Sequence, residues 1–297
     1  MTAMDATPKP PLAATCANPR VSPLAPAIGA EVAGVDLACI DDAGFAAVHA
    51  ALVAHHVIFF HGQTLGNQAL AAFARRFGEP QAAAESSFGK LDGYPEIDVL
   101  DYDASRPPYV TKEMWHTDFS GRARPTLGSV LYALEVPRAG GDTIWVSLAA
   151  AYDALSERMK FYLADLKAEH RTIKAFGDDI RANLRKDEGG QKRFEAMMAL
   201  PPVIHPVVCT HPVSGRKLLY LNEGYTTRLA GVERKEGDAV LNYLFEHLRT
   251  PEFQVRHHWR AGDVAVWDNR ITQHYALADY GERRLMHRIT IKGGAPA

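Results

Sequence analysis

The chain has 297 residues, 47% of them hydrophobic, and its 33 basic and 35 acidic side chains nearly balance to a formal net charge of -2. That composition is typical of a globular protein with a sizeable core, and it lacks the basic excess used to bind nucleic acid or an anionic membrane. We expect small-molecule partners, with neither nucleic acid nor membrane among them.

The three cysteines, Cys16, Cys39 and Cys209, are far apart in the sequence. Their spacing indicates neither a disulfide framework nor a thiolate zinc site. The N-terminus lacks the apolar stretch of a signal peptide, and no other run approaches the length of a membrane span. These features predict a cytoplasmic protein.

Six prolines lie between Pro8 and Pro26, among small residues without hydrophobic periodicity. Such a composition is typical of chain that does not pack into a core. We therefore predict a Pro-rich, disordered arm over residues 1–25. No linker or internal repeat follows, so residues 26–297 are expected to form a single catalytic domain.

The first half of the predicted domain begins with two strands and two helices. Strands are expected at 28–37 and 57–62. Between them, Asp41 or Asp42 is suited to cap an alanine-rich helix that runs to residue 56. A second helical pattern covers 67–78 and stops at Gly78, which suits a left-handed C-cap.

Beyond Gly78 the pattern changes to short β-rich runs separated by turn signals. We predict strands at 96–102, 129–136, 142–148, 202–208, 217–222, 253–259, 263–269 and 285–291. Many short strands with few helices indicate a mainly β fold, with a closed or sandwiched β core and flanking helices.

Two segments between these strands are predicted to differ from them. Residues 147–170 have the pattern of one amphipathic helix opened by Ser147. Residues 178–200 are polar and charged, which is typical of a solvated surface element or, less commonly, of a lid over an active site.

The stretch MWHTDFSG places His116 and Asp118 two residues apart. In a strand this spacing puts both side chains on one face, about 6.5 Å apart along the backbone, where one metal ion could bind both. Alone the pair is a weak signal, but His274 follows a predicted strand near the C-terminus. Two histidines and one carboxylate form the facial triad that holds Fe(II) and leaves positions open for a co-substrate and dioxygen.

Two arginines follow His274 in an extended segment. With a period of two, Arg284 and Arg288 share one face of the predicted strand. If that face is buried, each guanidinium needs an anion, because an unpaired buried charge is very costly. If it lies at an exposed edge, both arginines are merely solvated.

Five motifs occur in order along the chain: WHTD, GGDTIWVS, HPVVCTHPVSGRKLLYLNEGYTTR, WDNRITQHYALADY and RRLMHR. As an ordered set, spanning residues 28–292, they resemble the taurine dioxygenase family of Fe(II)- and 2-oxoglutarate-dependent oxygenases. The resemblance implies a double-stranded β-helix, or jelly roll. It also implies Fe(II), 2-oxoglutarate as co-substrate and O2, with release of succinate and CO2.

Roles for individual residues follow from the resemblance, motif by motif. The implied metal ligands are His116, Asp118 and His274. Thr143 and Arg284 would bind the distal carboxylate of 2-oxoglutarate. Residues implied at the substrate pocket are Arg288, which would face an anionic group, and the aromatic side chains Tyr225, Phe119 and Phe176.

Two other classes of protein are compatible with the same three ligands. A zinc hydrolase could use them to activate water. The predicted clamp of Arg284 and Thr143 argues against it, because hydrolysis has no need of a dicarboxylate. A non-catalytic jelly-roll sensor of small molecules is the other alternative.

The chain is also expected to form a homo-oligomer, a dimer or a tetramer.

The substrate is predicted from departures from the family. Where taurine dioxygenases carry a sulfonate-binding histidine, this chain has Ala82 to Ala84, and an asparagine-rich segment is replaced by one with Lys112 and Glu113. Arg288 remains available for an anion. We therefore expect a small organic anion, a sulfonate, sulfate ester or carboxylate, and poor use of taurine itself.

Overall fold

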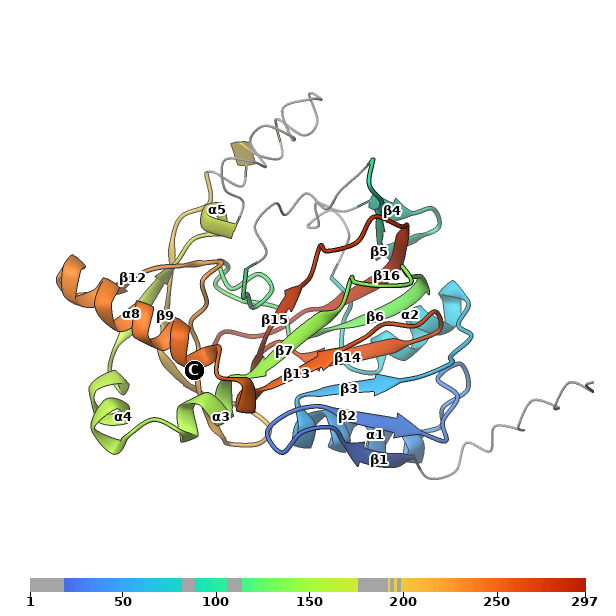
Figure 1. Cartoon of the computed structure of the whole chain (residues 1–297), viewed down its shortest axis with the longest axis horizontal. Helices are drawn as coiled ribbons and strands as arrows, with labels where there is room; N and C mark the ends of the chain where they lie inside the picture. The colour runs from blue at the N-terminus through green and yellow to red at the C-terminus, as the bar shows by residue number, and fades with distance from the viewer. Residues whose placement is uncertain (1–18, 82–88, 106–113, 176–191, 193–194, 197–198) are drawn as a thin grey trace, which may run out of the picture.

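An eight-stranded sheet is the largest element of the computed structural model, which describes residues 19–81, 89–105, 114–175, 192, 195–196 and 199–297 (Figure 1). All its strand pairs are antiparallel except β2 with β3. In spatial order the strands are β1 (Arg20–Pro23), β2 (Ala30–Ala33), β3 (Val57–Phe60), β14 (Val264–Asp268), β6 (Gly128–Glu135), β16 (Arg284–Ile291), β5 (Tyr94–Tyr102) and β4 (Gly89–Leu91).

A three-stranded sheet of β13 (Gln254–His257), β7 (Thr143–Ser147) and β15 (Thr272–Ala276) packs against one face of the large sheet. The aromatic rings of Phe59 and Trp267 from the large sheet lie 5.4 Å and 5.8 Å from Trp145 of β7, centroid to centroid. Two apposed sheets that bury such a layer form the predicted jelly roll, so the mainly β fold class is confirmed.

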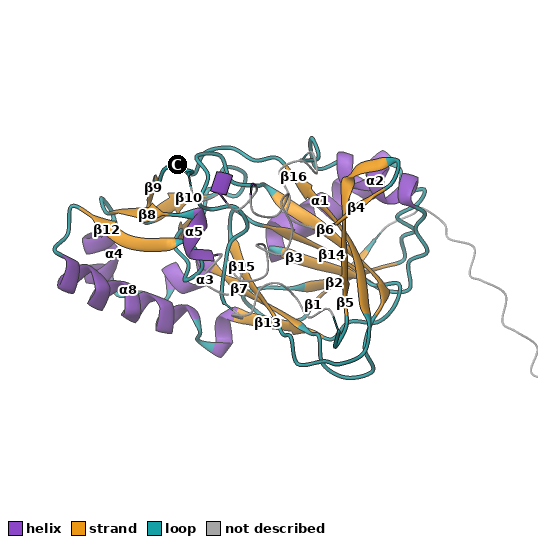
Figure 2. Cartoon of the chain, turned by 90° about the horizontal axis from the view of Figure 1, so that it is seen from above, coloured by secondary structure: helices purple, strands orange, loops and turns teal. Residues whose placement is uncertain are grey.

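Helices α1 (Asp42–His55) and α2 (Asn67–Arg75) cover the opposite face of the large sheet (Figure 2). The side chain of Asp41 accepts from Gly44 N at 2.7 Å, which confirms it as the N-cap of α1. The predicted C-cap at Gly78 is wrong, because α2 already ends at Arg75. The chain turns there with Arg76 in a right-handed conformation.

The remaining elements gather beside the small sheet around a second core (Figure 1). Its strands are β8 (Lys167–His170), β9 (Val203–Pro206), β10 (Val208–Thr210), β11 (Lys217–Leu219) and β12 (Thr226–Ala230). Its helices are α3 (Leu148–Asp153), α4 (Glu157–Leu163), α5 (Thr172–Ala175), α8 (Arg234–Leu248) and the 3-10 turn η2 (Pro251–Phe253).

The single helix predicted over 147–170 is wrong. Ser147 does cap a helix, but α3 ends at Asp153, and Ser156 starts α4 by accepting from Met159 N. The last residues of the segment form β8, which pairs with β9 and β12. Those partners lie far along the chain, so local periodicity did not reveal the strand.

The predicted boundary of the arm also needs correction. Residues 20–23 form β1, paired with β2 from Arg20 opposite Ala33 to Pro23 opposite Ala30. The folded chain therefore begins at or before Arg20 rather than at residue 26. Among the described residues no helix is long and apolar enough to cross a membrane.

Candidate active site

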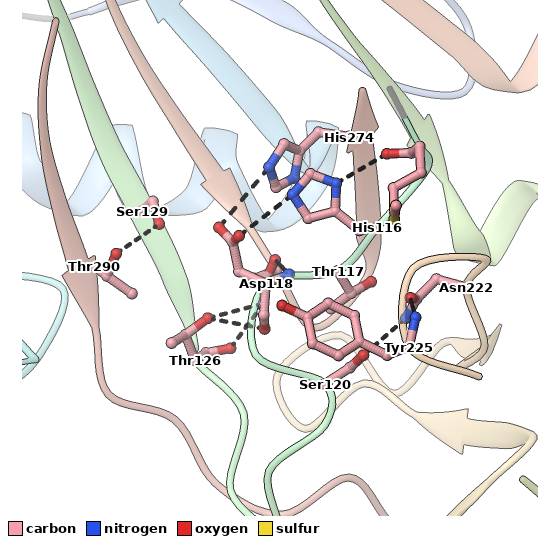
Figure 3. A network of polar contacts seen from close by, with 12 residues as sticks. His116, Thr117, Asp118, Ser120, Thr126, Ser129, Asn222, Tyr225, His274 and Thr290 are labelled. Carbon is pink, nitrogen blue, oxygen red and sulfur yellow. Dashed lines mark hydrogen bonds and ion pairs between the residues drawn. The ribbon is translucent and has the colours of Figure 1, made fainter. Parts of the chain in front are cut away.

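Two histidines from distant parts of the chain are joined through their backbones. His116 N donates to His274 O at 3.1 Å, and His274 N donates to His116 O at 2.9 Å. Residues directly opposite in an antiparallel pair project their side chains to the same side. The two imidazole rings accordingly lie 4.2 Å apart, centroid to centroid, and both face Asp118 (Figure 3).

Asp118 approaches the histidines from a turn, not from a strand as predicted. His116 makes only an isolated bridge, and a turn covers 118–121 with Phe119 at a φ of 56°. This reversal brings the Asp118 carboxylate back to the histidines, with Oδ1 3.5 Å from His116 Nε2 and Oδ2 3.9 Å from His274 Nε2. The expected side-chain cluster therefore forms, but by a different local structure.

The three side chains have the donor set of a divalent metal site. One ligand atom from each lies within 4.8 Å of the others. Burial, aided by the His116 ring, lowers the pKa of His274 to about 3, so its imidazole is neutral and can donate a lone pair. Burial alone would raise the pKa of the Asp118 carboxyl, but His274, His116 and Arg288 lower it, so the group is ionised. Asp118 Oδ2 is buried without a hydrogen-bond donor in the described chain, as expected of an atom reserved for a metal.

Asn269, at the end of the WDN motif, forms hydrogen bonds with both the backbone N–H and the backbone carbonyl of Asp118. Its Oδ1 accepts from Asp118 N at 3.0 Å, and its Nδ2 donates to Asp118 O at 2.9 Å and to Thr126 Oγ1 at 2.9 Å. Asn269 is fully buried just after β14, so the turn is tied to the large sheet. Asn269 was not identified as a site residue from the sequence, although it lies within the motif WDNRITQHYALADY.

A cavity of about 140 Å³ opens beside the histidines and contains the predicted co-substrate residues. Its lining includes His116, His274, Thr143, Arg284 and Arg288. The Arg284 side chain reaches it from β16 next to Tyr280, and Thr143 reaches it from β7, where its Oγ1 accepts from Trp259 Nε1 at 3.0 Å. The structure thus brings together a threonine and an arginine far apart in the sequence.

Arg284 is a buried cation without a carboxylate partner in the described chain. It is 5% exposed, its Nε has no hydrogen-bond acceptor there, and no ion pair joins it to a described acid. Burial lowers the pKa of this guanidinium, an effect that the Tyr280 hydroxyl only partly offsets. A buried charge of this kind needs an anion, and a carboxylate in the cavity would satisfy it.

Arg288 is buried as predicted, but it already has acidic neighbours. Its guanidinium lies 3.2 Å from Asp98 Oδ2 through Nη2 and 3.8 Å from Asp118 Oδ2 through Nη1. Burial alone would lower the pKa of Arg288, yet the two carboxylates raise it. Asp98 was not identified from the sequence, because only the register of β5 against β16 shows its partner.

Two of the three predicted substrate aromatics, Tyr225 and Phe119, lie around the turn of Asp118. Tyr225 is buried next to Asp118 (Figure 3), and burial together with that carboxylate raises the pKa of its phenol. Asn222 connects the two segments by accepting from Tyr225 N and donating to Ser120 Oγ, each at 2.9 Å. Phe119 is half-buried in the turn.

Several predicted features lie outside the described residues. They are Phe176, the alanines at 82–84, Lys112 and Glu113, and nearly all of the 178–200 insertion. Gly224, by contrast, is described and was missed. A Cβ there would lie 3.0 Å from His116 Cβ, so the NEGYTTR motif has a glycine where the chain passes close to His116.

Comparison with known proteins places this geometry in context. The sequence profile of the taurine catabolism dioxygenase TauD, TfdA family matches residues 20–290. An alpha-ketoglutarate-dependent sulfate ester dioxygenase of Pseudomonas putida is 36% identical over 283 residues, covering 93% of this chain and 90% of the relative. An alkylsulfatase of Acinetobacter baylyi is 35% identical over 270 residues, covering 90% and 82%.

A crystal structure of a taurine dioxygenase from Burkholderia xenovorans superposes with a TM-score of 0.79 at 34% identity. The superposition covers 94% of this chain and 91% of the other.

Replacing Asn269 should weaken metal binding without removing a ligand. Asn269→Ala deletes both hydrogen bonds to the Asp118 peptide, and losing such support for a ligand typically costs 10–100-fold, so we expect a loss of about that size in Mn(II) affinity by calorimetry. Asn222→Ala is the matched control, since Asn222 is equally buried but bonds Ser120 and Tyr225 instead. Equal losses in both variants would show that general destabilisation, not the clamp, is responsible.

Proposed function

The chain belongs to the taurine catabolism dioxygenase TauD, TfdA family, and we propose that it is an Fe(II)- and 2-oxoglutarate-dependent dioxygenase that oxidises a small organic anion. The observation that carries the proposal is the cavity that joins two facing histidines to Arg284, a buried arginine without a carboxylate partner in the described chain. A zinc hydrolase would have no use for that arginine.

His116, Asp118 and His274 would hold the iron. Bound Fe(II) would supply activation of O2, so that decarboxylation of 2-oxoglutarate to succinate and CO2 is coupled to hydroxylation of a C–H bond. The protein's own contribution is to fix the ligands. The backbone bridge sets the two imidazoles, and Asn269 sets the carboxylate.

Arg284 and Thr143 are proposed to bind the distal carboxylate of 2-oxoglutarate. A guanidinium offers a planar fork to a carboxylate, and the Thr143 hydroxyl adds a further donor when Trp259 donates to it. The other end of the keto acid would then lie toward the histidines at the opposite end of the cavity. This arrangement selects a dicarboxylate by its length and by its two charges.

The substrate is proposed to bind on the Tyr225 and Phe119 side of Asp118, with its anionic group facing Arg288. Relatives named for sulfate esters favour a sulfate ester among the three anion classes. Hydroxylation of the carbon that bears the ester oxygen would give a product that collapses to an aldehyde and inorganic sulfate. Phe176 is proposed as a further wall of this pocket.

Three further proposals concern the domain organisation, the localisation and the oligomeric state of the protein. Residues from Arg20 onward are proposed to form one catalytic domain, which acts in the cytoplasm. A homo-oligomer, dimer or tetramer, is proposed as the functional form; Phe161 of α4 is 86% exposed and would suit a contact between copies.

The metal assignment predicts a spectroscopic complex. Anaerobic protein given Fe(II) and 2-oxoglutarate should develop a weak visible charge-transfer band, because the keto acid would chelate an iron held by the three ligands. His116→Ala, Asp118→Ala and His274→Ala should each abolish the band, whereas His258→Ala, which removes a half-exposed histidine paired with Asp142, should keep it. Full activity with zinc alone and no keto acid would contradict the oxygenase proposal.

The role of Arg284 predicts a selective loss of co-substrate affinity. Arg284→Ala should weaken 2-oxoglutarate binding by about 2–5 kcal/mol, as expected when one member of a buried charge pair is removed, while Mn(II) binding is retained. Arg283→Ala is the matched control, because Arg283 is the adjacent arginine but is exposed and paired with Asp101 and Glu135. Loss of metal binding with unchanged 2-oxoglutarate affinity would mean that the two roles are assigned wrongly.

The substrate proposal predicts the outcome of a screen for succinate formation. With Fe(II), 2-oxoglutarate and O2, alkyl sulfates should stimulate succinate release with matching amounts of aldehyde and sulfate, and taurine should stimulate it poorly. Arg288→Ala should raise the KM for the anion with little effect on 2-oxoglutarate. Efficient and tightly coupled turnover of taurine would contradict the specificity proposed here.

A further inference from the structure

The two buried arginines of β16 lie opposite different residues of the neighbouring strand β5. The register places Tyr102 opposite Arg284 and Asp98 opposite Arg288. Both arginines line the same cavity, and both are at least nine-tenths buried. One guanidinium therefore faces a phenol, whereas the other faces a carboxylate.

Asp98 holds Arg288 along one edge of its guanidinium. Asp98 Oδ2 accepts from Nε at 3.4 Å and from Nη2 at 3.2 Å, and the two side chains are 6% and 8% exposed. With that edge engaged, Nη1 points toward the metal ligands and lies 3.8 Å from Asp118 Oδ2. Asp98 thus determines how Arg288 faces the site.

The same contact changes the charge that an incoming anion meets. In a poorly solvated site, one carboxylate a few ångströms from a guanidinium cancels much of its attraction for a second anion. Arg284 has no ion pair with a described acid, and Asp142 acts on it only from beyond ion-pair distance, whereas Arg288 has two acidic neighbours within 4 Å.

We propose that Asp98 is a specificity-determining residue, which compensates the charge of Arg288 and so limits how strongly the site prefers an anionic substrate to a neutral one. This inference rests on the proposed function, in which Arg288 faces the anionic group of the substrate. The organic part of the substrate must then contribute a larger share of the free energy of binding than it would if Arg288 had no carboxylate partner.

The test compares an anion with its neutral counterpart. Dissociation constants for hexanesulfonate and hexanesulfonamide are measured by calorimetry on anaerobic protein loaded with Fe(II) and 2-oxoglutarate. Asp98→Asn keeps the size and an acceptor oxygen but removes the charge. It should tighten hexanesulfonate binding about tenfold or more and leave the sulfonamide unchanged.

Asp101→Asn is the matched control, since Asp101 lies three residues along β5 and pairs with the exposed Arg283. It removes the same charge and should alter neither constant. Asp98→Glu, which keeps the charge, should retain the wild-type ratio. If the asparagine variant does not fold, Asp98→Ser makes the same comparison.

An unchanged or weaker affinity for hexanesulfonate in the charge-removed variant would overturn the role of Asp98. So would equal tightening in the Asp101 control, because the effect would then reflect net charge alone. The measurement involves no turnover. Failure of the proposed function would instead appear as an absence of succinate formation with any anion in wild-type protein.

Discussion

The reciprocal backbone hydrogen bonds between His116 and His274 are the constraint on which the rest of the site depends. They join a loop that precedes the turn of Asp118 to β15, a strand of the small sheet. β15 is paired along its whole length with β7, so the backbone of His274 is fixed by the small sheet. The hydrogen bonds to His274 then fix the backbone of His116 as well. The cluster of His116, Asp118 and His274 therefore depends on the packing of the two sheets against each other.

A second consequence of the sheets is the separation of charge along β16. This strand lies between β6 and β5, so its backbone is fixed on both sides. Arg284 and Arg288 project to one face with Met286 between them, and each meets the residue of β5 that the register supplies. Two buried cations therefore line one cavity. Arg288 forms an ion pair with Asp98, whereas Arg284 forms none with a described acid.

The features that sequence could predict are those carried by short-range pattern. Alternation correctly placed Arg284 and Arg288 on one face, whose burial only the structure decided. Ser147 and one of the two candidates at the first helix, Asp41, do cap helices. The side chains of His116 and Asp118 do meet, although the strand expected there is a bridge followed by a turn. Motif resemblance grouped Thr143 with Arg284, and both side chains line the same cavity, a grouping that no periodicity could predict.

The features that were missed depend on contacts between distant segments. β8 was assigned to a helix because its partners β9 and β12 lie beyond a long insertion. α8 was not predicted, although Leu241, Leu244 and Leu248 have helical spacing, because charged residues and Gly237 interrupt the pattern. Asp98 is one acid among many in the sequence until the register of β5 places it beside Arg288.

The contrast between the two arginines also relates stability to function. Asp98 offsets the cost of burying Arg288 in the protein itself, so that position is stable whether or not substrate is bound. The free-energy cost of burying Arg284 is offset only in part by Tyr280, Tyr102 and Asp142, and none of the described acids forms an ion pair with it. A dicarboxylate bound to Arg284 would offset the desolvation cost of burying the guanidinium. This gain would add to the free energy of binding of the dicarboxylate and would stabilise the folded protein. In the proposed assignment, the arginine that binds the co-substrate in every catalytic cycle is therefore the one that has no ion pair with a described acid.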